Sequence, residues 1–297
     1  LRSLDHAPRV AMAAGGDAQV VWNDTEGGDH AAARRHAGGQ WEEVVELATQ
    51  QMIAPHLVMN RRGDAALGSF RFGGIYVQRA RAAGLWGAPE EMRWGDVAFS
   101  GVRTPQVAID ETGDVMALWL QDAPTIVSLL ARRYDAASGH WETAAVLVDD
   151  ADVYLLRLAG NASGAAVAVW LQWDGSGYSL KSRRYDPGSG QWTAVETLNT
   201  EGVLHVAPFF APDVAMDGRG NAIALWIQDD TTEWTVRARR YDAAAGQWGS
   251  PEVLGAQTAG ALFLPQLAMN REGEAVAIWL EDEGVADALT LVARRYQ

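Results

Sequence analysis

Residues 214–226 read VAMDGRGNAIALW: an apolar run, a turn containing Asp217 and Gly220, and a second apolar run that ends at Trp226. Glycine adopts a positive φ without steric cost, and an Asp side chain can accept hydrogen bonds from its own backbone in a turn. Two short apolar runs on either side of such a turn are typical of a β-hairpin. The stretch therefore predicts two antiparallel strands joined by a tight turn.

Versions of this hairpin recur about every fifty residues along the chain. The first run opens at a proline, or in one copy a leucine: Pro8, Pro55, Pro105, Leu156, Pro212 and Pro265. A glycine follows eight residues later in every copy, at Gly16, Gly63, Gly113, Gly164, Gly220 and Gly273. A tryptophan ends the second run in five copies, at Trp22, Trp119, Trp170, Trp226 and Trp279. Repeats of this period indicate a solenoid, a propeller or an array.

Each copy continues with two more runs of strand length. The third run ends in a basic signature: Arg34-Arg35-His36, Arg79-Ala80-Arg81, Arg132-Arg133-Tyr134, Arg183-Arg184-Tyr185, Arg239-Arg240-Tyr241 and Arg294-Arg295-Tyr296. A turn then leads to a second tryptophan, which starts the fourth run, at Trp41, Trp86, Trp141, Trp192 and Trp248. No window shows helical spacing over a dozen residues. The sequence therefore predicts an all-β fold, a six-bladed β-propeller of four-stranded antiparallel blades.

The whole chain, residues 1–297, is predicted to form a single propeller domain. The copies span approximately residues 6–53, 54–102, 103–153, 154–209, 210–262 and 263–297. The last copy ends before a fourth run, and residues 1–5 precede the first marker where such a strand would lie. Because an unpaired edge strand is a liability, we expect this N-terminal segment to complete the last blade and close the ring.

The turn in residues 214–226 resembles the D-x-x-G-N turn of bacterial propeller repeats of the NHL and SBBP kind. The likeness covers about thirteen residues in each copy and recurs along the chain, although only the fifth copy carries the full motif. The resemblance implies a propeller that serves mainly as a binding platform. It implies no particular ligand.

Composition excludes several classes of partner. The formal net charge of −14 argues against nucleic acid or an anionic membrane as a partner, because phosphate binding needs clustered Lys and Arg. The chain has no cysteine, which excludes disulfides and thiolate metal sites, and no apolar run long enough for membrane insertion. We expect the protein to need no cofactor. The acidic loops keep Ca²⁺ open as an alternative, although no loop has EF-hand spacing. We expect an extracytoplasmic bacterial protein, whether periplasmic, cell-surface or secreted, and the oligomeric state stays open.

Three tryptophans stand outside the two repeated columns. The ten in the columns are expected to pack between blades. The other three, Trp94, Trp173 and Trp234, fall in loops that join the second strand to the third or one blade to the next, with Tyr178 nearby. In a propeller these loops share one face. Exposed aromatic side chains stack on sugar rings or anchor a protein partner, so the four residues are predicted to bind a ligand, the alternative being that they cap the blade cores.

A second group of candidates follows the marker position, at the start of each innermost strand. It contains Arg9, His56, Arg157 and Asp213, with Gln106 and Gln266 completing the ring. A six-fold arrangement would place Arg9 opposite Arg157 and His56 opposite Asp213. Polar groups near the axis must be hydrated, paired or used by a ligand, and a small anionic or zwitterionic ligand is the functional hypothesis.

The repeated arginines form a third group. The ring of Arg34, Arg79, Arg132, Arg183, Arg239 and Arg294 could bind carboxylates or phosphates. These residues lie toward the structural end of the third strand, so we expect them instead to pair with an Asp or Trp of a neighbouring strand.

The sequence contains no HExxH or GxSxG motif, and no catalytic residue can be named. The pattern favours a non-catalytic domain that binds carbohydrate or a protein or peptide ligand. Two alternatives remain open. One is a hydrolase or lyase with its site at the mouth of the central channel, where six-bladed sialidases and lactonases use Arg, Asp, Glu, Asn or His. The other is a scaffold module of a larger protein.

Overall fold

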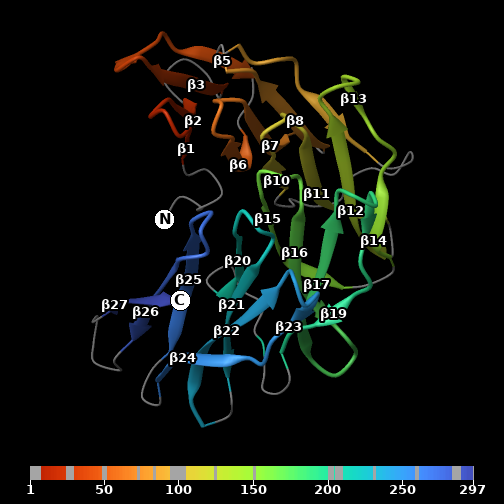
Figure 1. Cartoon of the computed structure of the whole chain (residues 1–297), viewed down its shortest axis with the longest axis vertical. Coiled ribbons are helices and arrows are strands. Elements are labelled where there is room, and N and C mark those ends of the chain that lie inside the picture. The colour runs from red at the N-terminus through yellow and green to blue at the C-terminus, as the bar shows by residue number, and fades with distance from the viewer. Residues whose placement is uncertain are drawn as a thin grey trace. The chain divides into compact units, whose positions relative to one another are not determined.

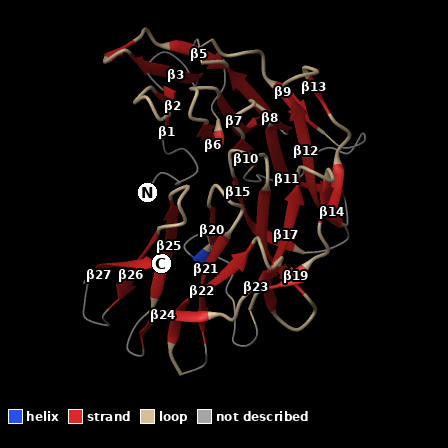
Figure 2. Ribbon diagram, viewed as in Figure 1, coloured by secondary structure: helices blue, strands red, loops and turns tan. Residues whose placement is uncertain are grey.

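The computed structural model describes residues 8–24, 30–48, 52–71, 74–82, 85–93, 105–123, 126–149, 152–199, 204, 210–229, 232–257, 261–282 and 289–296. Strands make up nearly all of the regular structure (Figure 2), and the described residues contain no α-helix. No helix that could cross a membrane is found among them. The chain divides into two compact units, Leu1–Asp150 and Ala151–Gln297.

The first unit holds three antiparallel sheets (Figure 1). Sheet A consists of β1 (Arg9–Met12), β2 (Ala18–Asp24), β3 (His30–Ala37), β4 (Gln40–Trp41) and β5 (Val45–Ala48). Sheet B consists of β6 (Ile53–Met59), β7 (Ala65–Arg71), β8 (Gly74–Ala80) and β9 (Glu90–Met92). Sheet C consists of β10 (Gln106–Ile109), β11 (Val115–Ala123), β12 (Ile126–Asp135), β13 (His140–Trp141) and β14 (Ala145–Val148).

The second unit repeats this plan (Figure 1). Sheet D consists of β15 (Val153–Gly160), β16 (Ala166–Trp173), β17 (Tyr178–Asp186), β18 (Gln191–Trp192) and β19 (Glu196–Thr197). Sheet E consists of β20 (Asp213–Met216), β21 (Ala222–Asp229), β22 (Trp234–Asp242), β23 (Gln247–Trp248) and β24 (Glu252–Gln257). Sheet F consists of β25 (Leu262–Met269), β26 (Ala275–Asp282) and β27 (Leu289–Tyr296).

Strands follow one another in chain order within each sheet, as predicted, but the fourth strand is usually split in two. In sheet E, β23 and β24 both pair with β22, and the second tryptophan, Trp248, belongs to the first, short piece. Sheets A, C and D are built in the same way. Sheet F has three strands, in agreement with the predicted loss of the fourth. Residues 1–5, which we expect to replace it, lie outside the described residues, so closure of the ring stays a prediction.

The D-x-x-G-N turn joins two hairpins of one sheet. Asp217 Oδ1 accepts the backbone N–H groups of Arg219 and Asn221, each at 2.8 Å, and Gly220 has a φ of 88°. Asn221 Oδ1 in turn accepts the N–H of Ala243, in the turn between β22 and β23, at 2.9 Å. The first residue of the motif therefore orders its own turn, and the last fastens the neighbouring turn to it.

The core lies between successive sheets of each unit. Trp226 of sheet E is 1% exposed and packs with Val167 and Val169 of sheet D. Trp119 packs in the same way with sheet B, and Trp279 with sheet E. The indole N–H of Trp226 donates to Oε1 of Gln228, two residues later, at 3.2 Å, which satisfies a buried donor. These three members of the first tryptophan column therefore pack between sheets, as predicted.

The second tryptophan column lies farther out. Trp141, Trp192 and Trp248 each contact the tyrosine of the basic signature in their own sheet, with ring centroids 5.4 to 5.5 Å apart. Trp248 still belongs to the core between sheets D and E, whereas Trp41 is 47% exposed. This column covers the outer margin of the cores rather than their centre.

The strand register corrects one sequence alignment. Ala65 pairs with Ala80 and Val115 pairs with Tyr134, so Arg79 corresponds to Arg133 rather than to Arg132. Ala65 and Ala80 are 15 positions apart in the chain, whereas Val115 and Tyr134 are 19 apart, so the hairpin of sheet B is shorter than that of sheet C. The comparison of the basic signatures alone was therefore one position out. Sheet B consequently has alanine where sheets C to F have tyrosine.

Several arginines of the signature have structural partners, and for Arg34 and Arg132 these include a tryptophan of the neighbouring strand, as predicted. The first arginine donates through Nε to a backbone carbonyl just after the second tryptophan. In sheet C, Arg132 donates to the carbonyl of Glu142 at 2.7 Å. The second stacks on the tyrosine of the next sheet: the Arg184 guanidinium carbon lies 3.6 Å from the ring centroid of Tyr241. These contacts fix neighbouring strands and sheets to one another.

Candidate functional site

Trp173 and Tyr178 face each other across the turn between β16 and β17. They form a cross-strand pair, and their ring centroids lie 4.9 Å apart with the planes inclined at 60°. The ring of Tyr178 also meets that of Tyr154 edge to face, at 5.7 Å. Trp173 is 39% exposed despite these contacts. The structure thus brings two of the predicted ligand-binding residues together, in a group of three rings that we call the aromatic cluster.

A tight turn fixes the aromatic cluster in place. Asp174 Oδ1 accepts the backbone N–H of Ser176 at 2.9 Å, the Ser176 hydroxyl at 2.7 Å and the N–H of Gly177 at 3.1 Å. Gly175 adopts a φ of 95°, which the turn requires. These hydrogen bonds, led by that of the Ser176 hydroxyl, lower the pKa of Asp174 to about 2. The carboxylate is therefore ionised at neutral pH and holds the turn in one shape.

Tyr154 reaches the aromatic cluster through an irregular first strand. The pairing of β15 with β16 shifts between Tyr154 and Arg157, and Leu155 has a left-handed φ of 51°. The backbone N–H of Trp173 donates to the carbonyl of Asp152 at 3.0 Å. The segment that enters the sheet and the hairpin between the second and third strands therefore meet at one end of sheet D, as the propeller plan predicts.

Trp234 lies in a different setting. Its ring stacks on Phe210, with centroids 5.1 Å apart and planes inclined at 14°, and Phe210 stacks on Phe263 at 5.9 Å. Both Trp234 and Phe210 are partly buried against the core between sheets E and F. This packing favours the alternative, that Trp234 caps a core. Trp94, the third predicted tryptophan, lies outside the described residues.

Three of the polar residues predicted to form a ring bond the backbone of the next sheet. Arg9 Nε donates to the carbonyl of Pro55 at 3.0 Å. His56 Nδ1 accepts the N–H of Val107 at 3.1 Å. Asp213 Oδ2 accepts the N–H of Leu267 at 2.7 Å, and its Oδ1 accepts that of Val214 at 2.9 Å. Each of the three thereby links successive first strands, a structural role that the spacing of the repeats did not reveal.

Asp213 is nevertheless electrostatically unusual. Burial raises the pKa of its carboxyl above the ordinary value, and the Leu267 N–H and the charge of Arg157 act in the opposite direction. Arg157 itself donates to the carbonyl of Leu156 at 3.0 Å. The pairings predicted across a central channel, Arg9 with Arg157 and His56 with Asp213, each join residues of different units and stay predictions.

A metal site is not apparent in the described part of the chain. There, no three carboxylate or imidazole side chains gather closely enough to hold an ion.

No family model matches the sequence, and neither does any curated protein. Solved structures do share the fold. A protein of unknown function from Dyadobacter fermentans is 14% identical with a TM-score of 0.56, over 97% of this chain and 93% of that one. An ulvan lyase, described as a new family of polysaccharide lyase and bound to -[GlcA(1-4)Rha3S]-, is 8% identical with a TM-score of 0.61, over 97% and 78%.

The α-L-arabinofuranosidase Arb93A from Fusarium graminearum, in complex with an iminosugar inhibitor, is 13% identical with a TM-score of 0.54, over 99% of this chain and 94% of that one. At such identities the likeness concerns the fold alone. The sheets of this chain are therefore of the β-propeller type, and the NHL or SBBP repeat type is not confirmed.

Proposed function

We propose that this chain is a non-catalytic, carbohydrate-binding propeller whose ligand stacks on Trp173. The observation that carries the proposal is that Trp173 stays 39% exposed while Tyr178 and the Asp174 turn fix its position. A large aromatic ring held rigid at the surface presents apolar area at little entropic cost on binding.

The surroundings of Trp173 suit a sugar. Pyranose rings have an apolar C–H face, which an indole can cover, and hydroxyl groups, which need hydrogen-bond partners. Asp174 and Ser176, in the exposed turn that follows Trp173, carry oxygen atoms that can act as such partners. The ulvan lyase and the arabinofuranosidase, which share the fold, were solved with sugar or sugar-like ligands, and this adds support.

A glycan array followed by calorimetry tests the proposal. We expect the wild-type chain to bind one class of oligosaccharide and Trp173→Ala to weaken that binding at least tenfold, or by about 1.4 kcal/mol. Trp41→Ala is the matched control, because Trp41 is similarly exposed but belongs to sheet A and not to the aromatic cluster. Equal affinities of Trp173→Ala and the wild type would rule the proposal out.

The raised pKa of Asp213 favours a second candidate, a hydrolase or lyase at the axial strands. A carboxyl that stays protonated more readily than usual can act as a general acid. On this hypothesis the chain turns over members of a panel of glycosides and uronides, and Asp213→Asn abolishes turnover while the fold is retained. A chain that neither binds nor converts any member of either panel would instead fit a scaffold module or a protein-binding module.

We also propose an extracytoplasmic location, because polysaccharides outside the cytoplasm are the ligands that such a site would meet. Fractionation of the cells that produce the protein checks this. Recovery of the chain in the cytoplasmic fraction alone would argue against it.

A further inference from the structure

A cavity of about 480 Å³ lies in the first unit, between sheets B and C. The β6–β7 and β10–β11 turns border it through Asp64 and Gly113. Leu85 and Ala88, from the connection between β8 and β9, form another part of its wall, and Leu85 is 79% exposed. The aromatic cluster, by contrast, lies beside a turn between second and third strands. The cavity is therefore distinct from the site proposed above.

The space exists because Arg79 departs from the arrangement found in the second unit. Arg184, which corresponds to Arg79, stacks on a tyrosine and donates through Nη2 to the carbonyl of Gly220 at 3.0 Å. Arg79 also stacks on a tyrosine, with its guanidinium carbon 3.3 Å from the ring centroid of Tyr134, but its Nη2 pairs with Glu90 at 2.5 Å. The Arg79 guanidinium thus points toward Glu90 rather than toward Gly113, the glycine that corresponds to Gly220. The space beside Gly113 that an arginine fills in the second unit is left to the cavity.

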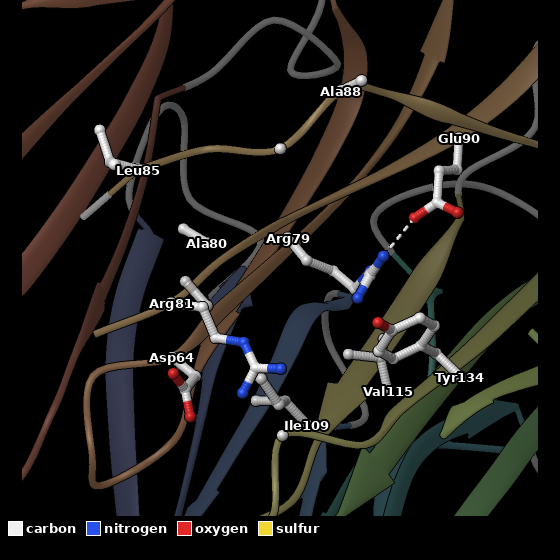
Figure 3. Close-up of a pocket in the computed structure, with 13 residues that line it drawn as sticks. Asp64, Arg79, Ala80, Arg81, Leu85, Ala88, Glu90, Ile109, Val115 and Tyr134 are labelled. Carbon is white, nitrogen blue, oxygen red and sulfur yellow. Dashed lines mark hydrogen bonds and ion pairs between the residues drawn. The ribbon is translucent and has the colours of Figure 1, made fainter. Parts of the chain in front are cut away.

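Arg81 lines the cavity beside Gly113. A Cβ added to Gly113 would lie 3.7 Å from Asp64 Oδ2 and 4.0 Å from Arg81 Nη1, so both side chains reach the cavity beside this glycine. Figure 3 shows the Arg81 guanidinium between Asp64 and Ile109. Within the described residues, Arg81 forms no hydrogen bond or ion pair. Its donors are free to receive a ligand.

The carboxylates of the cavity are already engaged. Asp64 Oδ1 accepts the backbone N–H of Ala82 at 2.9 Å, and its Oδ2 accepts Asn60 Nδ2 at 3.2 Å. Glu90 binds Arg79, as the dashed line in Figure 3 marks. The Nε of Arg79 is buried and has no hydrogen-bond partner. Because that nitrogen is not accessible, the unpaired guanidinium donors that a ligand could reach among the described lining residues are those of Arg81.

We propose that this cavity binds a small organic anion, with a carboxylate or sulfate ester held by Arg81 and the body of the ligand resting on Leu85 and Ile109. A guanidinium offers a planar pair of donors that matches two oxygens of such a group. The cavity volume lies within the range typical of small-molecule sites. An acidic monosaccharide combines the required charge and size.

NMR titration of the whole chain with glucuronate, galacturonate and glucose 6-sulfate tests the proposal, with glucose as the uncharged counterpart. We expect one of the anions to shift the amide signals of Gly87 and Gly113, and glucose to leave them unchanged. Arg81→Gln should weaken binding about tenfold or more, the factor expected for one charge-assisted hydrogen bond. Ala88→Trp, which puts a bulky ring at the wall of the cavity, should weaken it as well.

Arg62→Gln is the matched control. It removes the same charge from the β6–β7 turn at a residue that is exposed and does not line the cavity. Trp173→Ala should leave binding of the anion unchanged. This result would distinguish the cavity from the carbohydrate site proposed at the aromatic cluster. The proposal is overturned if none of the anions binds at millimolar concentration, if glucose binds equally well, or if Arg81→Gln binds like the wild type.

Discussion

The carboxylate of Asp174 determines how Trp173 is presented. It accepts three hydrogen bonds from Ser176 and Gly177, and it adjoins Trp173 in the chain. A stacking residue gains affinity when its position is fixed before the ligand arrives. The sequence showed Trp173 as one of three tryptophans outside the repeat, but nothing in it distinguished Asp174 from the other acidic loop residues.

We predict that Asp174→Ala weakens carbohydrate binding about three- to tenfold at neutral pH, because the turn loses its acceptor while the ring itself remains. Asp174→Asn should weaken it less, because the amide keeps one oxygen acceptor. Calorimetry with the ligand found on the array measures both. Equal binding by Asp174→Ala and the wild type would show that the turn does not organise the site.

The pKa of Asp174 adds a pH dependence at the same residue. Because the folded state lowers this pKa to about 2, the turn is stabilised in full above the ordinary value near 3.8, and the stabilisation is lost as the pH falls through about 2. Hydrogen exchange at the Gly177 amide should therefore be equally protected at pH 5 and pH 7, once corrected for intrinsic rates. A clear loss of protection between these two values would contradict the assignment.

At the scale of elements, sheets E and F fit together through a close contact between Gly255 and Trp279. A Cβ added to Gly255 of β24 would lie 2.7 Å from Cζ2 of Trp279, in the buried core between sheets E and F. Such a distance requires the indole or the strand to move, and Trp279 is tightly enclosed. The glycine is thus part of the packing between blades.

We predict that Gly255→Ala lowers the free energy of unfolding by about 1–3 kcal/mol, as overpacking of a core does. Gly15→Ala is the control, because an added Cβ there meets nothing within 4 Å. Chemical denaturation followed by tryptophan fluorescence compares the two. Similar midpoints for both variants would mean that sheet F is not packed on sheet E as described.

The elements also show where sequence reasoning reaches its limit. The hairpins were predictable because each turn has a glycine with positive φ, and five of the six have an Asp or Asn three residues before it, as at Gly220 and Asp217. The split fourth strand and the left-handed Leu155 have no comparable signal, because ordinary residues occupy them. The position of Arg79 was misjudged for a similar reason: a shorter hairpin shifted the register without altering the basic pattern.

The same limit applies to the candidate site. Trp173 and Tyr178 could be found because they do not belong to the repeat. The bonds of His56 and Asp213 to neighbouring strands could not, because they depend on contacts between copies rather than within one.

At the scale of the whole molecule, the six copies appear as six sheets, and the fold is of the propeller type. Closure into one ring, with residues 1–5 in the last blade, stays a prediction. A compact domain of this length should have a radius of gyration of about 19 Å. Small-angle scattering measures it, and a clearly larger value would indicate an open arrangement rather than a ring.

The most direct test of the account is a crystal structure of the chain with its best ligand from the glycan array. We predict a sugar ring lying parallel to the indole of Trp173, in van der Waals contact, with hydroxyl groups bonded near Asp174. A sugar found instead beside Asp213 and Arg157, with Trp173 uncovered, would contradict the central claim and place the function at the axial strands.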